Sequence, residues 1–156
     1  MNFFKKLLSI IFINIIFFNL TISRDEFNAL NSSIKFINNA TGLQVNLTSL
    51  NNLNKYVLLI VYLNDIDTCI TMAPIYERIY SYYHNKHVEC IRMYSNTNNL
   101  FSILCNYASN VNYLTTIVPE KLPALYVFKN QTLVKKQLEG LHSYDEIINY
   151  VNSCFG

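Results

Sequence analysis

Apolar and polar positions along the chain predict strands that alternate with helices. The run "YVLLIVYL", residues 56–63, is apolar at both alternating sets of positions and rich in β-branched and aromatic residues. This pattern predicts a strand buried on both faces at the centre of a sheet. After a turn-like stretch, apolar residues spaced three and four apart from Met72 to Tyr83 predict a helix that tolerates Pro74 near its start. The loop between these two elements contains Cys69.

The same pattern predicts the other elements of one domain. They are a strand at 43–47, a short helix or turn at 48–54, a second buried strand at 87–94, a helix around 100–108, paired strands at 124–129 and 133–139 around Asn130 and Gln131, and a final helix over 144–154 that follows Gly140. Strands and helices in this order predict an α/β fold, with a central mixed β-sheet flanked by helices.

Residues 1–23 have the pattern of a secretory signal peptide. Lys5 and Lys6 form the charged flank, an apolar stretch follows, and Thr21 and Ser23 are the small residues before the expected cleavage site. An uncleaved membrane anchor is the alternative, but the apolar stretch is short and contains two asparagines. Residues 24–41 have helical spacing and are interpreted as an N-terminal helical extension or linker, and 42–156 as the domain. We therefore expect a protein of the secretory pathway that is secreted or resides in the ER lumen or a vacuolar compartment.

Charge and motifs exclude several classes of function. The formal charge of +2 falls to about zero without the two signal lysines, so nucleic acid is not an expected partner. The three glycines form no phosphate-binding loop, and no cofactor is implied. His84, His87 and Cys90 lack a fourth ligand, so no metal site is predicted.

The four cysteines allow two interpretations. In an oxidising compartment, Cys69, Cys90, Cys105 and Cys154 have three fully paired connectivities, among which the sequence does not choose. Buried free cysteines are also common in protein cores. Either way, the wide and irregular spacing favours a structural role for these residues over a metal site.

Three features in the expected order resemble the thioredoxin superfamily. The buried strand leads through a loop to a helix with Cys69 and Pro74, "LPALYVFKN" resembles the family's loop proline and hairpin, and Gly140 precedes the last helix. In the family, the helix proline lies five residues after the second cysteine of a Cys-x-x-Cys motif, as Pro74 does after Cys69. The resemblance therefore gives Cys69 the resolving position and places Ile66 where the first cysteine stands.

Three departures from the family pattern bear on chemistry. Isoleucine at position 66 cannot ionise or form a mixed disulfide, which is the first thiol's task at the helix N-terminus. The buried acid of many active thioredoxins falls at Ile60, and the tryptophan before the motif falls at Asp65. The resemblance thus implies a redox-inactive member that has kept the scaffold and acts through binding.

The expected site combines two stretches of the chain. By resemblance, Pro123 is a cis proline that faces the motif loop and leaves nearby backbone groups able to pair with an extended peptide. The expected contact surface is formed by Ile66, Asp67, Thr68, Leu122, Pro123 and Ala124, with Cys69 as the one candidate catalytic thiol.

The expected partners are an unfolded or extended polypeptide, or the subunits of a protein-handling complex, in protein folding or trafficking. A membrane is a partner only if the N-terminal segment is uncleaved. The alternatives are a weak thiol-disulfide oxidoreductase that uses Cys69 alone or with Cys90 or Cys105, and a purely structural subunit.

Overall fold

The computed structural model describes residues 5–6, 25–51 and 55–156. The predicted signal peptide therefore lies outside the described residues, apart from Lys5 and Lys6. Within the described ranges, no helix is long and apolar enough to cross a membrane.

A mixed β-sheet forms the centre of the molecule. Its strands are β1 (Lys35–Phe36), β2 (Tyr56–Tyr62), β3 (Val88–Tyr94), β4 (Ala124–Lys129), β5 (Thr132–Leu133) and β6 (Leu138–Glu139). The order is β1-β3-β2-β4-β5, and β6 also pairs with β4. The strand predicted from "YVLLIVYL" lies at the centre, parallel to β3 and antiparallel to β4, and only Tyr56 along it is not fully buried. The two-sided apolar pattern of this strand is thereby confirmed.

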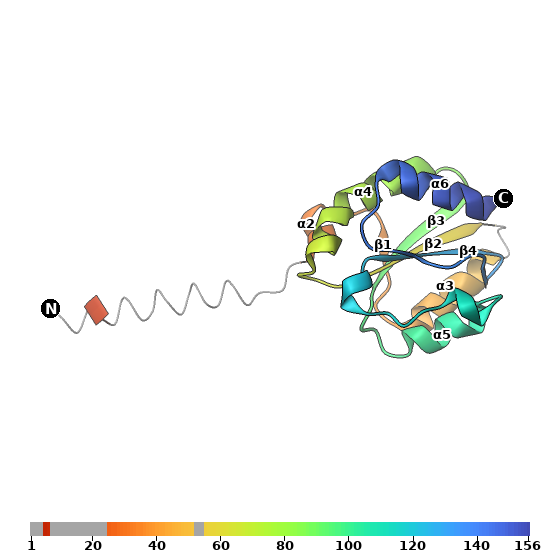
Figure 1. Ribbon diagram of the computed structural model, residues 1–156, viewed down its shortest axis with the longest axis horizontal. Helices are drawn as coiled ribbons and strands as arrows, with labels where there is room; N and C mark the ends of the chain where they lie inside the picture. Colours follow the sequence, from red (N-terminus) through yellow and green to blue (C-terminus); the bar gives the residue numbers. More distant parts are fainter. Residues whose placement is uncertain (1–4, 7–24, 52–54) are drawn as a thin grey trace.

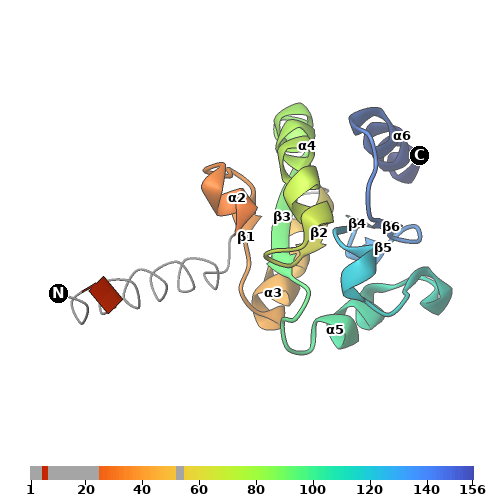
Figure 2. The same ribbon diagram turned by 60° about the vertical axis from the view of Figure 1, so that its left-hand side comes forward.

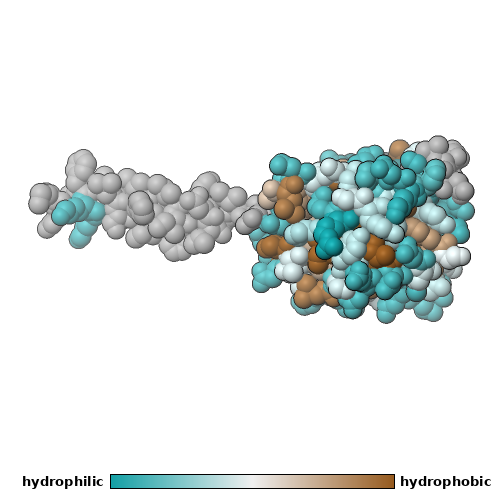
Figure 3. Space-filling model, turned by 90° about the horizontal axis from the view of Figure 1, so that it is seen from above, coloured by the Kyte–Doolittle hydropathy of each residue, from teal (hydrophilic) through white to brown (hydrophobic). Residues whose placement is uncertain are grey.

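Helices cover both faces of the sheet. The helices are α2 (Glu26–Ala29), α3 (Ala40–Asn51), α4 (Asp67–Tyr83), α5 (Leu100–Tyr107) and α6 (Tyr144–Phe155), with short 3₁₀ turns η1 (Val111–Tyr113) and η2 (Pro119–Lys121). Figure 1 shows α4 and α6 on one face and α3 and α5 on the other. Seen from above the α4 and α6 layer, the surface is mainly hydrophilic, with small scattered hydrophobic groups (Figure 3).

The N-terminal segment, interpreted from the sequence as a helical extension or linker over 24–41, is helical only in part. Helix α2 is only four residues long, because Leu30 ends it and Asn31 turns the backbone into the left-handed region with a φ of 51°. The chain then enters β1, which pairs with β3 at the edge of the sheet (Figure 2). Phe27 and Ile34 are buried at 1% and 2% exposure, whereas Leu30 is 41% exposed. The helical spacing of the apolar residues was therefore coincidental. Phe27 packs in the core from the short helix α2, and Ile34 packs there from the segment that leads into β1.

The predicted strand at 43–47 is wrong. These residues lie inside α3, and the buried side chains of Ala40, Leu43 and Leu47 are three and four positions apart along the helix. Asn39 accepts a hydrogen bond from the backbone N–H of Gly42 at 2.7 Å and so supports the helix start. The alternation of apolar and polar residues in "LQVNL" fits either element, and the buried set follows the helical period.

The predicted second strand of the hairpin is divided in two. Leu133 pairs with Phe128, and Leu138 pairs with Leu125. Four residues, 134–137, separate Leu133 from Leu138, whereas only two residues of β4 separate their partners. Residues 134–137 therefore bulge out between β5 and β6. Gly140 ends β6 with a φ of 78°, a conformation that L side chains rarely adopt.

A buried ion pair ties the start of the domain to the sheet. The guanidinium of Arg92 on β3 lies 3.5 Å from the carboxylate of Asp25, and these side chains are 6% and 8% exposed. Arg92 also donates to the Ile34 carbonyl and to the Tyr62 hydroxyl, at 3.1 and 2.6 Å. Asp25 accepts hydrogen bonds from the hydroxyls of Tyr62 and Tyr94 and caps α2. Each charge therefore has several partners, which offset the cost of burying it in the core.

Candidate functional site

The first stretch of the predicted site begins helix α4. After β2 the chain turns at Asp65, whose φ is 60°, and reaches Ile66, the extended residue that precedes the helix. Ile66 has no polar side chain to cap α4, and the acidic Asp67 in the first turn interacts favourably with the positive end of the helix dipole. An apolar side chain therefore occupies the position immediately before the helix.

The second stretch lies directly beside the first. The peptide bond between Leu122 and Pro123 is cis, as the sequence predicts, and Ala124 begins β4. The hydroxyl of Thr68 donates a hydrogen bond to the Leu122 carbonyl at 2.6 Å, across 54 residues of sequence. The structure thus brings together the two stretches that the sequence assigned to one site.

Burial restricts what the second stretch presents to a partner. Leu122 and Ala124 are 0% and 3% exposed, and Pro123 is also buried. Their side chains therefore contribute no exposed surface and support the loop from beneath. Of the predicted contact residues, Ile66, Asp67 and Thr68 are the ones with accessible side chains.

Cys69 lies in the first turn of α4 but points into the core. Its side chain is 3% exposed, and burial raises the pKa of the thiol, with partial opposition from a hydrogen bond to the Leu63 backbone. A buried thiol with a raised pKa supplies little thiolate near neutral pH, and thiolate is the attacking species in disulfide exchange. The geometry therefore does not favour Cys69 as a nucleophile.

None of the other cysteines joins Cys69 in a disulfide, because all four are free in the structure. Cys105 is exposed on α5, which covers the opposite face of the sheet from α4 (Figure 1). Cys90 is buried in β3, where burial raises its pKa to about 12. Cys69, Cys90 and Cys154 are buried free thiols, as the interpretation of core cysteines expects, and Cys105 is not.

An open hollow of about 330 Å³ lies at the start of α4. It is lined by Ile66, Asp67 and Thr68 from one side and by Pro119 and Glu120 of η2 from the other. Sequence reasoning missed Pro119 and Glu120, although they stand only four and three residues before the cis proline. Their closeness to Pro123 in the sequence is the feature that could have identified them as site residues.

A second missed residue follows β6. The backbone N–H of Gly140 donates to the Pro123 carbonyl at 2.9 Å, so the turn after β6 lies against the cis-proline loop. Leu141, the next residue, is 59% exposed. The sequence singled out Gly140 but not the exposed apolar residue beside it.

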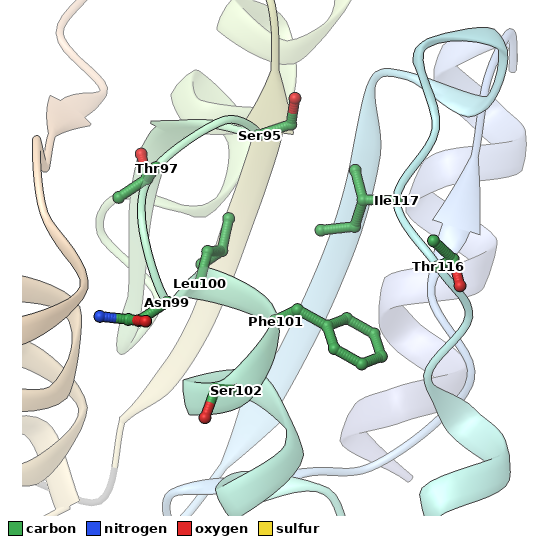
Figure 4. A pocket seen from close by; sticks show the side chains of 8 residues that line it. All are labelled: Ser95, Thr97, Asn99, Leu100, Phe101, Ser102, Thr116 and Ile117. Atoms are coloured by element: carbon green, nitrogen blue, oxygen red, sulfur yellow. The ribbon is translucent and has the colours of Figure 1, made fainter.

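A neighbouring pocket of about 350 Å³ has a different character. Figure 4 shows the side chains of Leu100, Phe101 and Ile117 between the start of α5 and the segment before η2. The remaining lining residues are Ser95, Thr97, Asn99, Ser102 and Thr116, and none of the lining residues carries a charge. The pocket at Ile66, in contrast, combines apolar side chains with two carboxylates.

No protein-family model matches the chain, and no curated protein matches it in sequence. Thioredoxins are among the solved structures that are similar to this chain. The short form of spinach chloroplast thioredoxin f is 18% identical, with a TM-score of 0.56 over 78% of this chain and 93% of that one. A thioredoxin from Nicotiana alata is 15% identical, with a TM-score of 0.54 over 76% and 91%. A mutant thioredoxin from Halobacterium salinarum is 18% identical, with a TM-score of 0.54 over 78% and 90%.

These likenesses agree with the order of strands and with the helices on both faces of the sheet. The protein therefore has the thioredoxin-like α/β fold, a mixed sheet flanked by helices.

Proposed function

We propose that this protein is a thioredoxin-like protein of the secretory pathway that binds extended polypeptide without dithiol oxidoreductase activity. It acts as a polypeptide-binding or adaptor subunit in protein folding or trafficking. The pattern of residues 1–23 supports the location, and the site at the start of α4 supports the binding role.

The observation that carries the proposal is the position of Ile66. An apolar side chain stands immediately before α4, beside the cis-proline loop, where the resemblance to thioredoxins places a reactive cysteine. Ile66 lines an open hollow together with Pro119. An apolar residue at the rim of such a hollow supplies contact area to a client and no redox chemistry.

The state of Cys69 supports the absence of dithiol exchange. Exchange needs a thiolate that attacks a disulfide and a second thiol that resolves the mixed species. Ile66 supplies no thiol, and Cys69 is 3% exposed with a raised pKa. Binding is the function that remains for this face.

A peptide-binding assay tests the role of Ile66. We expect the Ile66→Ser variant to lose most affinity for a fluorescent, unfolded client such as reduced, alkylated ribonuclease, measured by anisotropy. Serine is a favoured residue at this helix position, so the variant retains a capped α4 and circular dichroism should match the natural protein. Val45→Ser is the matched control, because Val45 is 63% exposed on α3, on the other face of the sheet. Equal binding by both variants and the natural protein would contradict the proposal.

An insulin-reduction assay tests the redox half of the proposal. We expect no turnover by the natural protein and measurable turnover by Ile66→Cys, which restores a thiol at the start of α4 three residues before Cys69. Turnover by the natural protein that disappears in Cys69→Ser would make Cys69 a working thiol and overturn this part.

A further inference from the structure

Two residues with carboxylate side chains line the hollow at Ile66. Asp67 comes from the first turn of α4, and Glu120 comes from η2, so two separate elements supply the negative charges. Both side chains are exposed. Among the residues that the structure describes, neither carboxylate has a hydrogen-bond or ion-pair partner.

The nearby positive charges do not neutralise this pair. Lys121, next to Glu120, forms an ion pair with Glu139 at 3.5 Å, so its charge is already balanced. The positive end of the α4 dipole amounts to about half a unit charge, against two full negative charges at the hollow. The net field at the hollow is therefore negative.

From this arrangement we infer that the hollow selects basic clients: extended polypeptide segments in which an apolar side chain stands next to lysine or arginine. The apolar side chain packs on Ile66 and Pro119, and the neighbouring cation lies between Asp67 and Glu120. Opposite charges at a rim contribute selectivity and faster association more than raw affinity. This inference rests on the proposed polypeptide-binding function and adds the chemical class of the client.

The pockets around Leu100 and Val45 do not compete for such a client. The neighbouring pocket around Leu100 has no charged lining residue, and the hollow on α3 around Val45 is also lined without charge. Charge complementarity therefore directs a basic segment to the Ile66 hollow.

Three labelled peptides of about nine residues test the inference by fluorescence anisotropy. Each has the same central leucine in an extended glycine-poor frame, flanked by lysines, by glutamines or by glutamates. We expect affinity to decrease in that order, and the advantage of the lysine peptide to shrink as salt is raised. Asp67→Asn and Glu120→Gln should each weaken binding of the lysine peptide about two- to fivefold more than binding of the glutamine peptide.

Glu89→Gln is the matched control for the loss of one charge. Glu89 lies near the start of β3, whereas α4 begins beyond the opposite end of the parallel strand β2. We expect no change in the preference for lysine in this variant. Asp67 and Glu120 lie on different elements, so if one of the two site variants fails to fold, the other still tests the inference.

The outcomes separate this inference from the proposed function. If all three peptides bind equally, or if Glu89→Gln reduces the preference as much as the site variants do, polypeptide binding stands and the selection of basic clients is wrong. If none of the peptides binds and the Ile66→Ser variant behaves like the natural protein with the unfolded client, both the function and the inference are wrong.

Discussion

Removal of the Asp25 carboxylate should destabilise the whole domain, although the residue lies at the start of the described chain. In Asp25→Ala, Arg92 loses its counter-ion while its guanidinium stays 6% exposed between the sheet and α2. Loss of one partner from a buried ion pair typically costs about 3–5 kcal/mol, because the remaining charge is uncompensated. The hydroxyls of Tyr62 and Tyr94 lose their acceptor in the same change. We therefore expect the free energy of unfolding to fall by about 3–5 kcal/mol.

Urea denaturation followed by circular dichroism measures this effect. With an m-value of about 2 kcal/mol per molar, the midpoint should fall by roughly 1.5–2.5 M. Asp25→Asn keeps the shape and an acceptor for the α2 cap but loses the charge and the second acceptor oxygen, so its loss should be smaller than that of Asp25→Ala. Asp145→Ala is the control, since this exposed acid in the first turn of α6 contributes at most about 1 kcal/mol.

A loss below about 1 kcal/mol in Asp25→Ala would refute the reasoning. It would mean that the Arg92 charge finds water or another partner when Asp25 is absent, and that residues 25–37 contribute little to the domain. A loss in Asp145→Ala equal to that in Asp25→Ala would show that burial is not the deciding factor.

Two further predictions concern titratable groups. In the folded protein, iodoacetamide should modify the exposed Cys105 near neutral pH, and it should modify Cys69 only after unfolding in urea. Peptide mass mapping identifies the labelled cysteines. Equal labelling rates of Cys105 and Cys69 without urea would contradict the burial of Cys69. The pKa of Glu146 is lowered, chiefly because its carboxylate accepts the backbone N–H of Ser143 in a capping box. The contribution of Glu146 to stability is therefore complete above the ordinary pKa of 4.5 and is lost as pH falls through the lower folded pKa. The stability difference between the natural protein and Glu146→Gln should accordingly shrink as the pH is lowered below 4.5, and a difference that stays constant there would contradict the prediction.

The sequence predicts the central elements well because their burial is strong and local. Tyr56 to Tyr62 is apolar in every position, and only a strand covered on both sides accommodates that pattern in so short a run. The buried face of α4 repeats at helical spacing, which a strand would not satisfy. The cis Leu122-Pro123 bond and the contact between its loop and Thr68 follow from the resemblance to a known fold.

The elements that the sequence does not predict depend on contacts between distant residues. Residues 43–47 fit either a helix or a strand, and the packing of Leu43 and Leu47 decides for a helix. Helix α2 ends at a left-handed Asn31, which no periodicity reveals. The ion pair of Asp25 with Arg92 joins two elements far apart in sequence, and so does the hollow that Glu120 and Asp67 line together.

The hydrogen bond from Thr68 to the Leu122 carbonyl has a consequence for recognition. It joins the first turn of α4 to the loop before β4 when no client is present. A binding surface whose parts already hold their final positions loses little conformational entropy on association. Thr68→Val would release that constraint, and the site would then order itself anew with every client that arrives. In the natural protein, Thr68 makes the site preorganised, so discrimination among clients falls to the side chains at its rim.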